Sequence, residues 1–281
     1  MDTLFLTQLI TSFIVGGAVI ALLTLLAERV NTHASGIVLA LPSTMALGFF
    51  FLGWAVSAKQ VANVIPSTLI PLGLAVLFPI FYIYIAERTS AIFTSKYTQI
   101  LVSTTISMGL WFILGLPVVL LQFNSFFVGI LGYAALTLTS SVLLNRTSRK
   151  KLPSPTYSPA QKIGRAVFAG CVSMLVVLFG KIFGPFWGGM FTMCPAALLS
   201  SLVMLHWYYD PKNLFPTFKR FALGSVTLLV YSFTVMLVFP VIGFVFGTIV
   251  AYATSLFTSL LLSKVEFGQA VKTAPSNVRA E

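Results

Sequence analysis

The side chains best suited to bind a ligand stand beside two prolines in apolar stretches. Ser43 and Thr44 directly follow Pro42, and Thr192 precedes Pro195 by three residues. Hydroxyl groups hydrogen-bond neutral polar ligands, although within a helix they often bond back to their own backbone. We predict a substrate-binding site around the two prolines, formed by Pro42, Ser43, Thr44, Thr192, Cys194 and Pro195.

The backbone beside each proline adds to this prediction. Proline has no N–H, so a helix that contains it leaves the carbonyl four residues earlier without a partner, in this chain Val38 and Phe191. Hydrocarbon cannot satisfy such a carbonyl, and broken helices at membrane depth occur where protein or a water-lined cavity supplies partners. Matching breaks in two halves of a chain are typical of transport sites.

Other kinds of chemistry find no support in the sequence. It contains no HExxH motif, nucleophile elbow, Walker loop or paired carboxylates, and no Cys/His cluster with metal-ligand spacing. Both cysteines, Cys171 and Cys194, fall in apolar stretches, where a small buried side chain is the expected role. We therefore expect no enzyme activity, no cofactor and no metal site.

Ionisable groups are confined to the ends of the apolar stretches. Coupled carriers commonly keep an acid within the membrane, but in this chain the acidic residues lie at predicted helix ends or in loops. Proton coupling would have to use Glu28 or His33, near the end of the first helical pair. For His33 itself and for His206 we favour a place at the membrane interface.

These residues must be positioned by membrane-spanning helices. The 281-residue chain is 58% hydrophobic and 8% charged, and apolar runs long enough to cross a bilayer recur along it. We predict an all-α polytopic helix bundle with nine spans: Leu4 to Ala27, Ser35 to Val56, Val61 to Ala86, Tyr97 to Leu121, Phe126 to Leu144, Ala166 to Gly184, Phe186 to Trp207, Phe218 to Phe239 and Val241 to Leu262.

Basic residues predict the orientation of these spans. Of the 17 lysines and arginines, only Lys59 and Lys181 fall on the side of the N-terminus, and the other 15 fall on the opposite side. Cytoplasmic loops carry the excess of such residues, so we place the N-terminus outside and the C-terminus in the cytoplasm. The net charge of +11 lies in short loops between spans, which indicates a lipid partner and no nucleic acid.

A segment of the chain occurs twice at a spacing of 153 residues. Four residue types recur at this spacing, as the pairs Gly36 and Gly189, Pro42 and Pro195, Trp54 and Trp207, and Lys59 and Lys212. Five spans separate the starts of the two copies, so the copies enter the membrane in opposite orientations and form inverted repeats. We assign the glycines Gly36 and Gly189 to helix packing or hinge motion.

The repeat divides the chain into four parts. Residues 1–145 form the first membrane repeat with five helices, 146–165 a basic cytoplasmic linker, 166–264 the second repeat with four helices, and 265–281 a disordered cytoplasmic tail. The counterpart of the ninth helix is either the fourth or the fifth. The fifth matches better, through Phe127-Val-Gly129 and Val245-Phe-Gly247, but it runs in the same direction, which strict inversion forbids.

Gly164 to Lys264 resembles the small four-helix inner-membrane proteins called GlpM-like. The resemblance consists of an apolar helix, a Gly-x-x-x-x-x-Pro helix, a short basic loop and two further helices, the last with Phe-Val-Phe-Gly247. It implies small proteins that pair in opposite orientations, fused into one chain in this case, and a multi-pass protein of a bacterial inner membrane. Cys194-Pro195-Ala196 departs from the Phe-Pro-Thr that is more usual there, and the family implies no activity.

These features favour a secondary transporter or permease that works by alternating access between inverted repeats, with a flippase-like carrier as one form of it. Without an intramembrane counter-ion, a neutral, zwitterionic or amphiphilic small molecule is the expected substrate, bound at the broken second and seventh helices. The alternative is a non-transporting membrane scaffold or assembly protein, whose centre would be dry and fully packed.

Overall fold

The chain folds into a bundle of helices that embeds in a lipid bilayer. The computed structural model describes residues 3–29, 42–145, 158–218 and 221–272, and all regular structure in them is helical. Seven helical segments in this part of the chain are long and apolar enough to cross a membrane: Thr3–Leu25, Ala58–Ile92, Lys96–Leu120, Phe126–Leu144, Pro159–Ile182, Pro185–Tyr208 and Phe221–Lys264. The all-α class and the multi-pass membrane character predicted from the sequence are confirmed.

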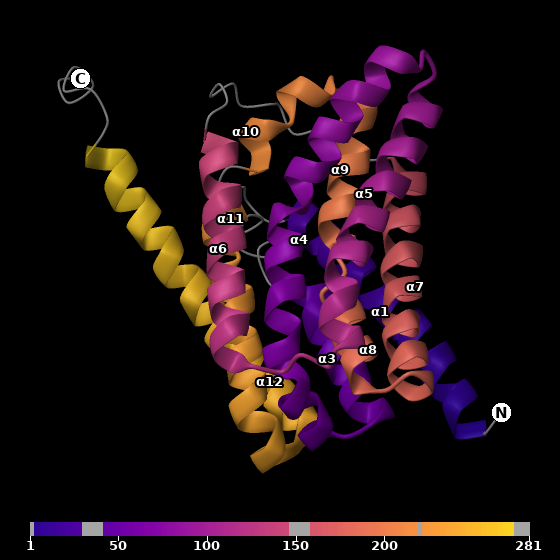
Figure 1. Cartoon of the computed structure of the whole chain (residues 1–281), viewed down its shortest axis with the longest axis vertical. Helices are drawn as coiled ribbons and strands as arrows, with labels where there is room; N and C mark the ends of the chain where they lie inside the picture. Colours follow the sequence, from indigo (N-terminus) through magenta and orange to yellow (C-terminus); the bar gives the residue numbers. More distant parts are fainter. Residues whose placement is uncertain (1–2, 30–41, 146–157, 219–220, 273–281) are drawn as a thin grey trace.

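The helices run up and down the bundle in turn (Figure 1). Along the chain they are α1 (Thr3–Arg29), α3 (Ser43–Ala55), α4 (Ala58–Ile92), α5 (Lys96–Leu120), α6 (Phe126–Asn145), α7 (Pro159–Ile182), α8 (Pro185–Thr192), α9 (Ala196–Tyr208), η1 (Pro211–Asn213), α10 (Phe215–Phe218), α11 (Phe221–Gly224) and α12 (Val226–Lys272). The name basic end is used below for the end of the bundle at which α4 ends and at which α5 and α7 begin. It is uppermost in Figure 1.

The long helix α4 lies at the centre of the bundle. It packs against α5, α6, α8 and α12, and most of its side chains are buried. Three prolines interrupt its hydrogen bonding, and Trp111 of α5 donates from its indole N–H to the carbonyl of Pro71 at 3.4 Å. This bond ties α5 to α4, whereas the carbonyls that the three prolines leave without a helical donor are those of Ala62, Ser67 and Ala75.

The last helix, α12, reverses direction in its middle. Gly243 has φ 78° and ψ 174°, which is not helical, and a positive φ is readily adopted by glycine alone. The two halves then run back along each other, since the Ser255 hydroxyl donates to the carbonyl of Thr227 at 3.0 Å and Gly247 packs on Phe239. Each half is long enough for a separate passage through the bilayer.

Helix boundaries differ from the sequence predictions around the predicted linker and tail. Helix α7 begins at Pro159, so residues 159–165 of the predicted linker are helical, because Ser158 and Gln161 form a capping box around a proline in the first turn. The backbone of α12 continues to Lys272, eight residues into the predicted tail. The predicted span Ser35 to Val56 is described only from residue 42 onward.

Helix boundaries in the two halves of the chain agree at the spacing of 153. Helices α3 and α9 have 13 residues each, and 196 − 43 and 208 − 55 both equal 153.

Contacts between α1 and α7 also come in matched pairs. Gly17 faces the carbonyl of Ala166, and Gly170 faces the carbonyl of Phe13. Since 13 + 153 is 166 and 17 + 153 is 170, the contact of Gly17 with Ala166 is the repeat counterpart of the contact of Gly170 with Phe13. The missing side chains at both glycines let the backbones of α1 and α7 approach closely.

Candidate functional site

The two prolines of the predicted site hold the same backbone position. Pro42 is the N-cap of α3 with φ −75° and ψ 47°, and Pro195 is the N-cap of α9 with φ −73° and ψ 44°. Their carbonyls accept from Ala46 and Leu199 at 2.7 Å each. Both prolines are buried in protein, so neither faces lipid.

The predicted break is present in the second half of the chain, but its carbonyl has a partner. Helix α8 ends at Thr192 and α9 begins at Ala196, as a proline at position 195 requires. The expectation that the Phe191 carbonyl is left open is wrong: the N–H of Cys194 donates to it at 3.0 Å in a tight turn. The corresponding carbonyl, Val38, lies outside the described residues.

Side chains at the second break are packed against the first half of the chain. Thr192 is buried, donates to the carbonyl of Gly188 at 2.9 Å, and touches α3 where Gly48 has no side chain. Leu52 of α3 lies against Gly188, so α3 and α8 run antiparallel. Cys194 is buried in the main core cluster.

The remaining predicted residues are placed as follows. Ser43 and Thr44 begin α3 and are half-buried. Gly189 faces Thr68 of α4 and so serves close packing. Glu28 lies in the last turn of α1 without a described side chain, and His33 and Gly36 lie outside the described residues. Thus Pro42, Thr192, Cys194 and Pro195 are buried within the bundle, and their ligand-binding role stays a prediction.

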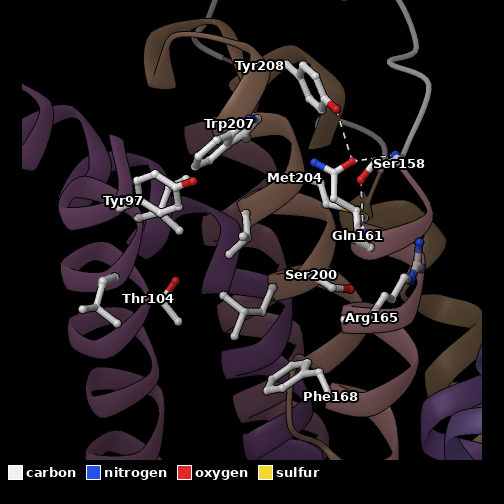
Figure 2. A pocket seen from close by; sticks show the side chains of 16 residues that line it. Tyr97, Thr104, Ser158, Gln161, Arg165, Phe168, Ser200, Met204, Trp207 and Tyr208 are labelled. Atoms are coloured by element: carbon white, nitrogen blue, oxygen red, sulfur yellow. Dashed lines mark hydrogen bonds between the residues drawn. The ribbon is translucent and has the colours of Figure 1, made fainter. Parts of the chain in front are cut away.

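A pocket opens beside this packed region. It has a volume of about 1030 Å³ and lies between α5, α7 and α9, with α9 as its floor (Figure 2). Its deepest α9 residues include Leu199, whose N–H is bonded to the carbonyl of Pro195, so the pocket ends one turn from the break. None of the residues predicted to bind substrate lines it.

The pocket changes in character along its length. Near the basic end it is lined by Tyr97, Ser158, Gln161, Trp207 and Tyr208. Farther in, the walls are mostly apolar, with Phe168, Leu199 and Val203 among them. Such a gradient matches the passage from the headgroup region of a bilayer to its hydrocarbon, where tyrosine and tryptophan gather at the boundary.

Gln161 is the most constrained polar side chain on the pocket wall. Its carbonyl oxygen accepts from the Ser158 N–H at 2.9 Å and from the Tyr208 hydroxyl at 3.2 Å. Because a backbone N–H can only donate, the oxygen must face Ser158. The amide nitrogen therefore turns the other way, toward the space between α7 and α5 (Figure 2).

A buried polar pair stands behind the pocket, between α4 and α9. His206 is fully buried, and its Nδ1 lies 3.1 Å from the hydroxyl of Tyr82. The Lys96 ammonium donates to the His206 carbonyl at 3.0 Å and fastens the end of α9. His206 lies in the last turn of its helix, and its ring is buried inside the protein, because Tyr82 offers it a partner. The interfacial depth predicted for it stays a prediction.

The equivalent place in the first half is occupied by aromatic side chains. Subtracting 153 from Ser158, Val203, Met204 and Trp207 gives Phe5, Phe50, Phe51 and Trp54, which pack together on α1 and α3. Phe244 of α12 joins them, with its ring centroid 5.2 Å from that of Phe50. We call Phe5, Phe50, Phe51, Trp54 and Phe244 the aromatic cluster.

A glutamine closes the aromatic cluster from the side. Gln8, the counterpart of Gln161 because 161 − 8 is 153, is buried and donates to the carbonyl of Trp54 at 2.9 Å. It ties α1 to the end of α3. The repetition of glutamine at this spacing is a sequence feature that could have indicated both places in advance.

The chemistry that the pocket can support is binding. Among the described residues, no group of three or more histidine, cysteine or acidic side chains could hold a metal ion. The pocket lining contains hydroxyls, an amide, one guanidinium and no carboxylate. This arrangement can hold a molecule with an apolar body and a polar end.

No known family model matches the chain, and no curated protein and no solved structure is significantly similar to it. The resemblance to GlpM-like proteins therefore stays a hypothesis that depends on its short motif.

Proposed function

We propose that the protein is a secondary transporter that moves a neutral, zwitterionic or amphiphilic small molecule across the membrane by alternating access. In this proposal, the chain crosses the bilayer nine times, with the N-terminus outside and the basic end in the cytoplasm. The two halves are inverted repeats, and they exchange an opening at the basic end for one at the other end.

The observation that carries the proposal is the unequal filling of two equivalent places. The pocket between α5, α7 and α9 is hollow, whereas its counterpart in the first half holds the aromatic cluster. A carrier built from inverted repeats has this asymmetry in any one state, because one pathway is open while the other is closed. The structure would then correspond to the state open toward the basic end.

Matched boundaries and matched contacts support the repeat itself. Helices α3 and α9 share length and N-cap geometry, and the paired contacts at Gly17 and Gly170 relate α1 to α7. Helices α3 and α9 begin at the buried residues Pro42 and Pro195. A proline N-cap ends the regular helix at that point, so the angle of each helix can change there. These two points are the natural hinges of the proposed motion.

The second candidate function, a non-transporting scaffold, has one observation in its favour. The second break is packed against α3, with Thr192 seated on Gly48 and its hydroxyl bonded within α8. A scaffold needs no further opening there.

Paired cysteine accessibility separates the two candidates. With Cys171 and Cys194 replaced by alanine, Ser200→Cys places a thiol in the pocket and Leu47→Cys places one at the equivalent position in the other half, since 200 − 47 is 153. A carrier exposes Ser200→Cys to an impermeant maleimide from the basic side and Leu47→Cys from the opposite side. A scaffold leaves Leu47→Cys unreactive.

Coupling between the two places gives a stricter readout. A bulky maleimide attached to Ser200→Cys should prevent closure of the pocket and so lower the labelling rate at Leu47→Cys, because the opposite opening requires that closure. Labelling rates at the two cysteines that do not influence each other would contradict alternating access.

A further inference from the structure

We propose that His206 is a proton-binding site reached from the pocket through Thr104 and Tyr82, and that the proton is the coupling ion of the transporter. The coupling rests on the proposed function, whereas proton binding at His206 is tested independently of transport. This assignment differs from the sequence prediction, in which proton coupling would have to use Glu28 or His33.

His206 is an ionisable side chain inside a helical segment that can span a membrane. It belongs to the segment Pro185–Tyr208, which is long and apolar enough to cross a bilayer, and it is fully buried. Ionisable residues in such segments are rare and commonly belong to substrate or proton pathways. Histidine is also the side chain that most readily gains and loses a proton near neutral pH.

Packing alone does not account for this imidazole. Its Nδ1 lies 3.1 Å from the Tyr82 hydroxyl, but its Nε2 has no hydrogen-bond partner among the described residues. A buried polar atom without a partner is costly, so an apolar side chain would pack at this place at a lower cost. The repeat requires no polar group there either, since the equivalent residue in the first half is Gly53. The imidazole therefore points to a role beyond packing.

Two hydroxyl groups lie between the imidazole and the pocket. Thr104 stands on the α5 wall of the pocket (Figure 2). Its oxygen is buried and close enough to the Tyr82 hydroxyl to interact with it, but no described residue meets it in full hydrogen-bonding geometry. A threonine in a helix has two favoured rotamers, so this hydroxyl can turn between Tyr82 and the pocket. Hydroxyl groups both donate and accept, so each can take up one proton as it passes on another.

The transfer requires that Tyr82 donates to Nδ1, so that the neutral ring carries its own proton on Nε2. Tyr82 then passes its proton to Nδ1 and takes one from Thr104, which in turn takes one from a hydronium ion in the pocket. Both hydroxyl groups are restored, the hydronium ion becomes water and the imidazole becomes imidazolium. The net change is one proton moved from the pocket to His206.

A positive charge on His206 would act on the end of α9 that lies far from its proposed hinge. The groups that face the ring are Tyr82 of α4, Lys96 of α5 and Asp210 in the turn after α9. The charged residue that α7 contributes to the pocket wall is Arg165. Because Nε2 has no described acceptor in this arrangement, the imidazolium favours a different position of α9, and protonation shifts the population of states accordingly.

Nuclear magnetic resonance of the full-length chain with isotope-labelled histidine tests the site. The chain has two histidines, so His33→Gln leaves the signals of His206 alone. We expect the Nε2–H tautomer at about pH 8, where an ordinary imidazole is neutral, and a reversible titration at lower pH in the folded protein. A ring that keeps one protonation state wherever the protein stays folded would overturn the proposal, and so would the Nδ1–H tautomer.

Variants of the pocket wall test the route. Thr104→Val retains the shape of the side chain without its hydroxyl, and should slow the exchange of His206 between its neutral and charged forms by about tenfold or more. Thr104→Ser should restore the exchange rate. Thr137→Val is the matched control, since Thr137 of α6 also has a buried hydroxyl without a described partner but does not line the pocket. Equal exchange rates in Thr104→Val and Thr137→Val would overturn the proposed route.

Blocked cysteines test the coupling. A bulky maleimide on Ser200→Cys holds the pocket open, and the same reagent on Leu47→Cys holds the opposite end open. Because coupling between sites is reciprocal, the proton affinity of His206 should differ about fivefold or more between the two blocked proteins. Equal affinities would overturn the proton as coupling ion while alternating access stands. A Leu47→Cys that never reacts would reject transport and its coupling, and the titration of His206 would still decide the proton site.

Discussion

The pocket between α5, α7 and α9 and the aromatic cluster on α1, α3 and α12 occupy equivalent places, yet the first is hollow and the second is filled. The difference begins with side-chain volume: Phe5 and Phe50 stand where the other half has Ser158 and Val203. It continues at Gly53, whose missing side chain admits Phe244, while the equivalent residue is the buried His206. Thus the chain keeps the helix geometry of both halves but encodes different packing at their two ends.

In the proposed transport cycle, the unequal packing would favour one resting state. Buried aromatic side chains such as Phe51 contribute strongly to packing, so the aromatic cluster would stabilise the end that the proposal takes as closed. Opening that end would require these rings to separate, whereas closing the basic end would require only that α5 and α7 approach α9. Substitutions at equivalent positions should therefore have unequal effects, greatest at the buried glutamine of the first half and least at the polar pair behind the pocket.

The two glutamines should respond oppositely to the same change. Gln8→Glu replaces a buried donor to the Trp54 carbonyl by a carboxylate, and should reduce the free energy of unfolding by about 4 kcal/mol, as for a buried charge without a partner. Gln161→Glu, near the pocket mouth, should change it by less than about 1 kcal/mol. Unfolding in a denaturing detergent measures both, and equal losses would contradict the closed and open assignments.

Truncation of a buried ring in the aromatic cluster should lower the free energy of unfolding more than truncation of a side chain on the pocket wall. Phe51 is 1% exposed, and Phe51→Ala should lower the free energy of unfolding by about 3 kcal/mol because it leaves a cavity. Val203→Ala in the half-buried pocket wall should cost about 1 kcal/mol or less. The same unfolding assay decides this, and a larger loss at Val203 would reverse the comparison.

The contact between α3 and α8 should not tolerate a side chain. A Cβ at Gly48 would lie 2.7 Å from Cγ2 of Thr192, so Gly48→Ala should cost about 2 kcal/mol through overpacking. Gly109→Ala is the control, because no atom lies within 4 Å of its Cβ position and alanine favours a helix by up to about 1 kcal/mol. If Gly48→Ala and Gly109→Ala had the same thermal unfolding temperature, the contact between α3 and α8 would be able to adjust to an added methyl group, which would contradict this prediction.

The weakest response is expected at the polar pair behind the pocket. Tyr82→Phe removes the hydroxyl that lies 3.1 Å from Nδ1 of His206, and should cost about 1 kcal/mol, the net value of one hydrogen bond. Maleimide labelling of Ser200→Cys in the pocket should not change, since neither residue lines it. A change in the labelling rate without a change in stability would make this pair part of the pocket wall.

Local chemistry explains which features the sequence could predict. Hydropathy predicts the membrane class, and the missing proline N–H predicts the helix break before Pro195, because both depend on residues close in the chain. The early start of α7 is also readable from Ser158, Pro159 and Gln161, although the basic, proline-containing composition around them is equally typical of a linker.

Features that depend on distant residues could not be predicted in the same way. Thr192 is seated on Gly48 of α3, 144 residues earlier, and no local pattern indicates that contact. His206 is buried because Tyr82, 124 residues earlier, reaches its ring. The pocket lies where α5 and α7 both pack on α9, and hydropathy patterns contain no information on how three helices from distant parts of the chain meet.

The reversal at Gly243 also limits how the protein can be labelled. The two halves of α12 are joined through a single left-handed glycine and pack closely on each other. An epitope or a glycosylation acceptor inserted at Gly243 would replace the one backbone conformation on which the reversal, and with it the packing of Gly247 on Phe239, depends. Reporters of membrane orientation are better placed at residues 122–125, between α5 and α6, where the chain already leaves its helices.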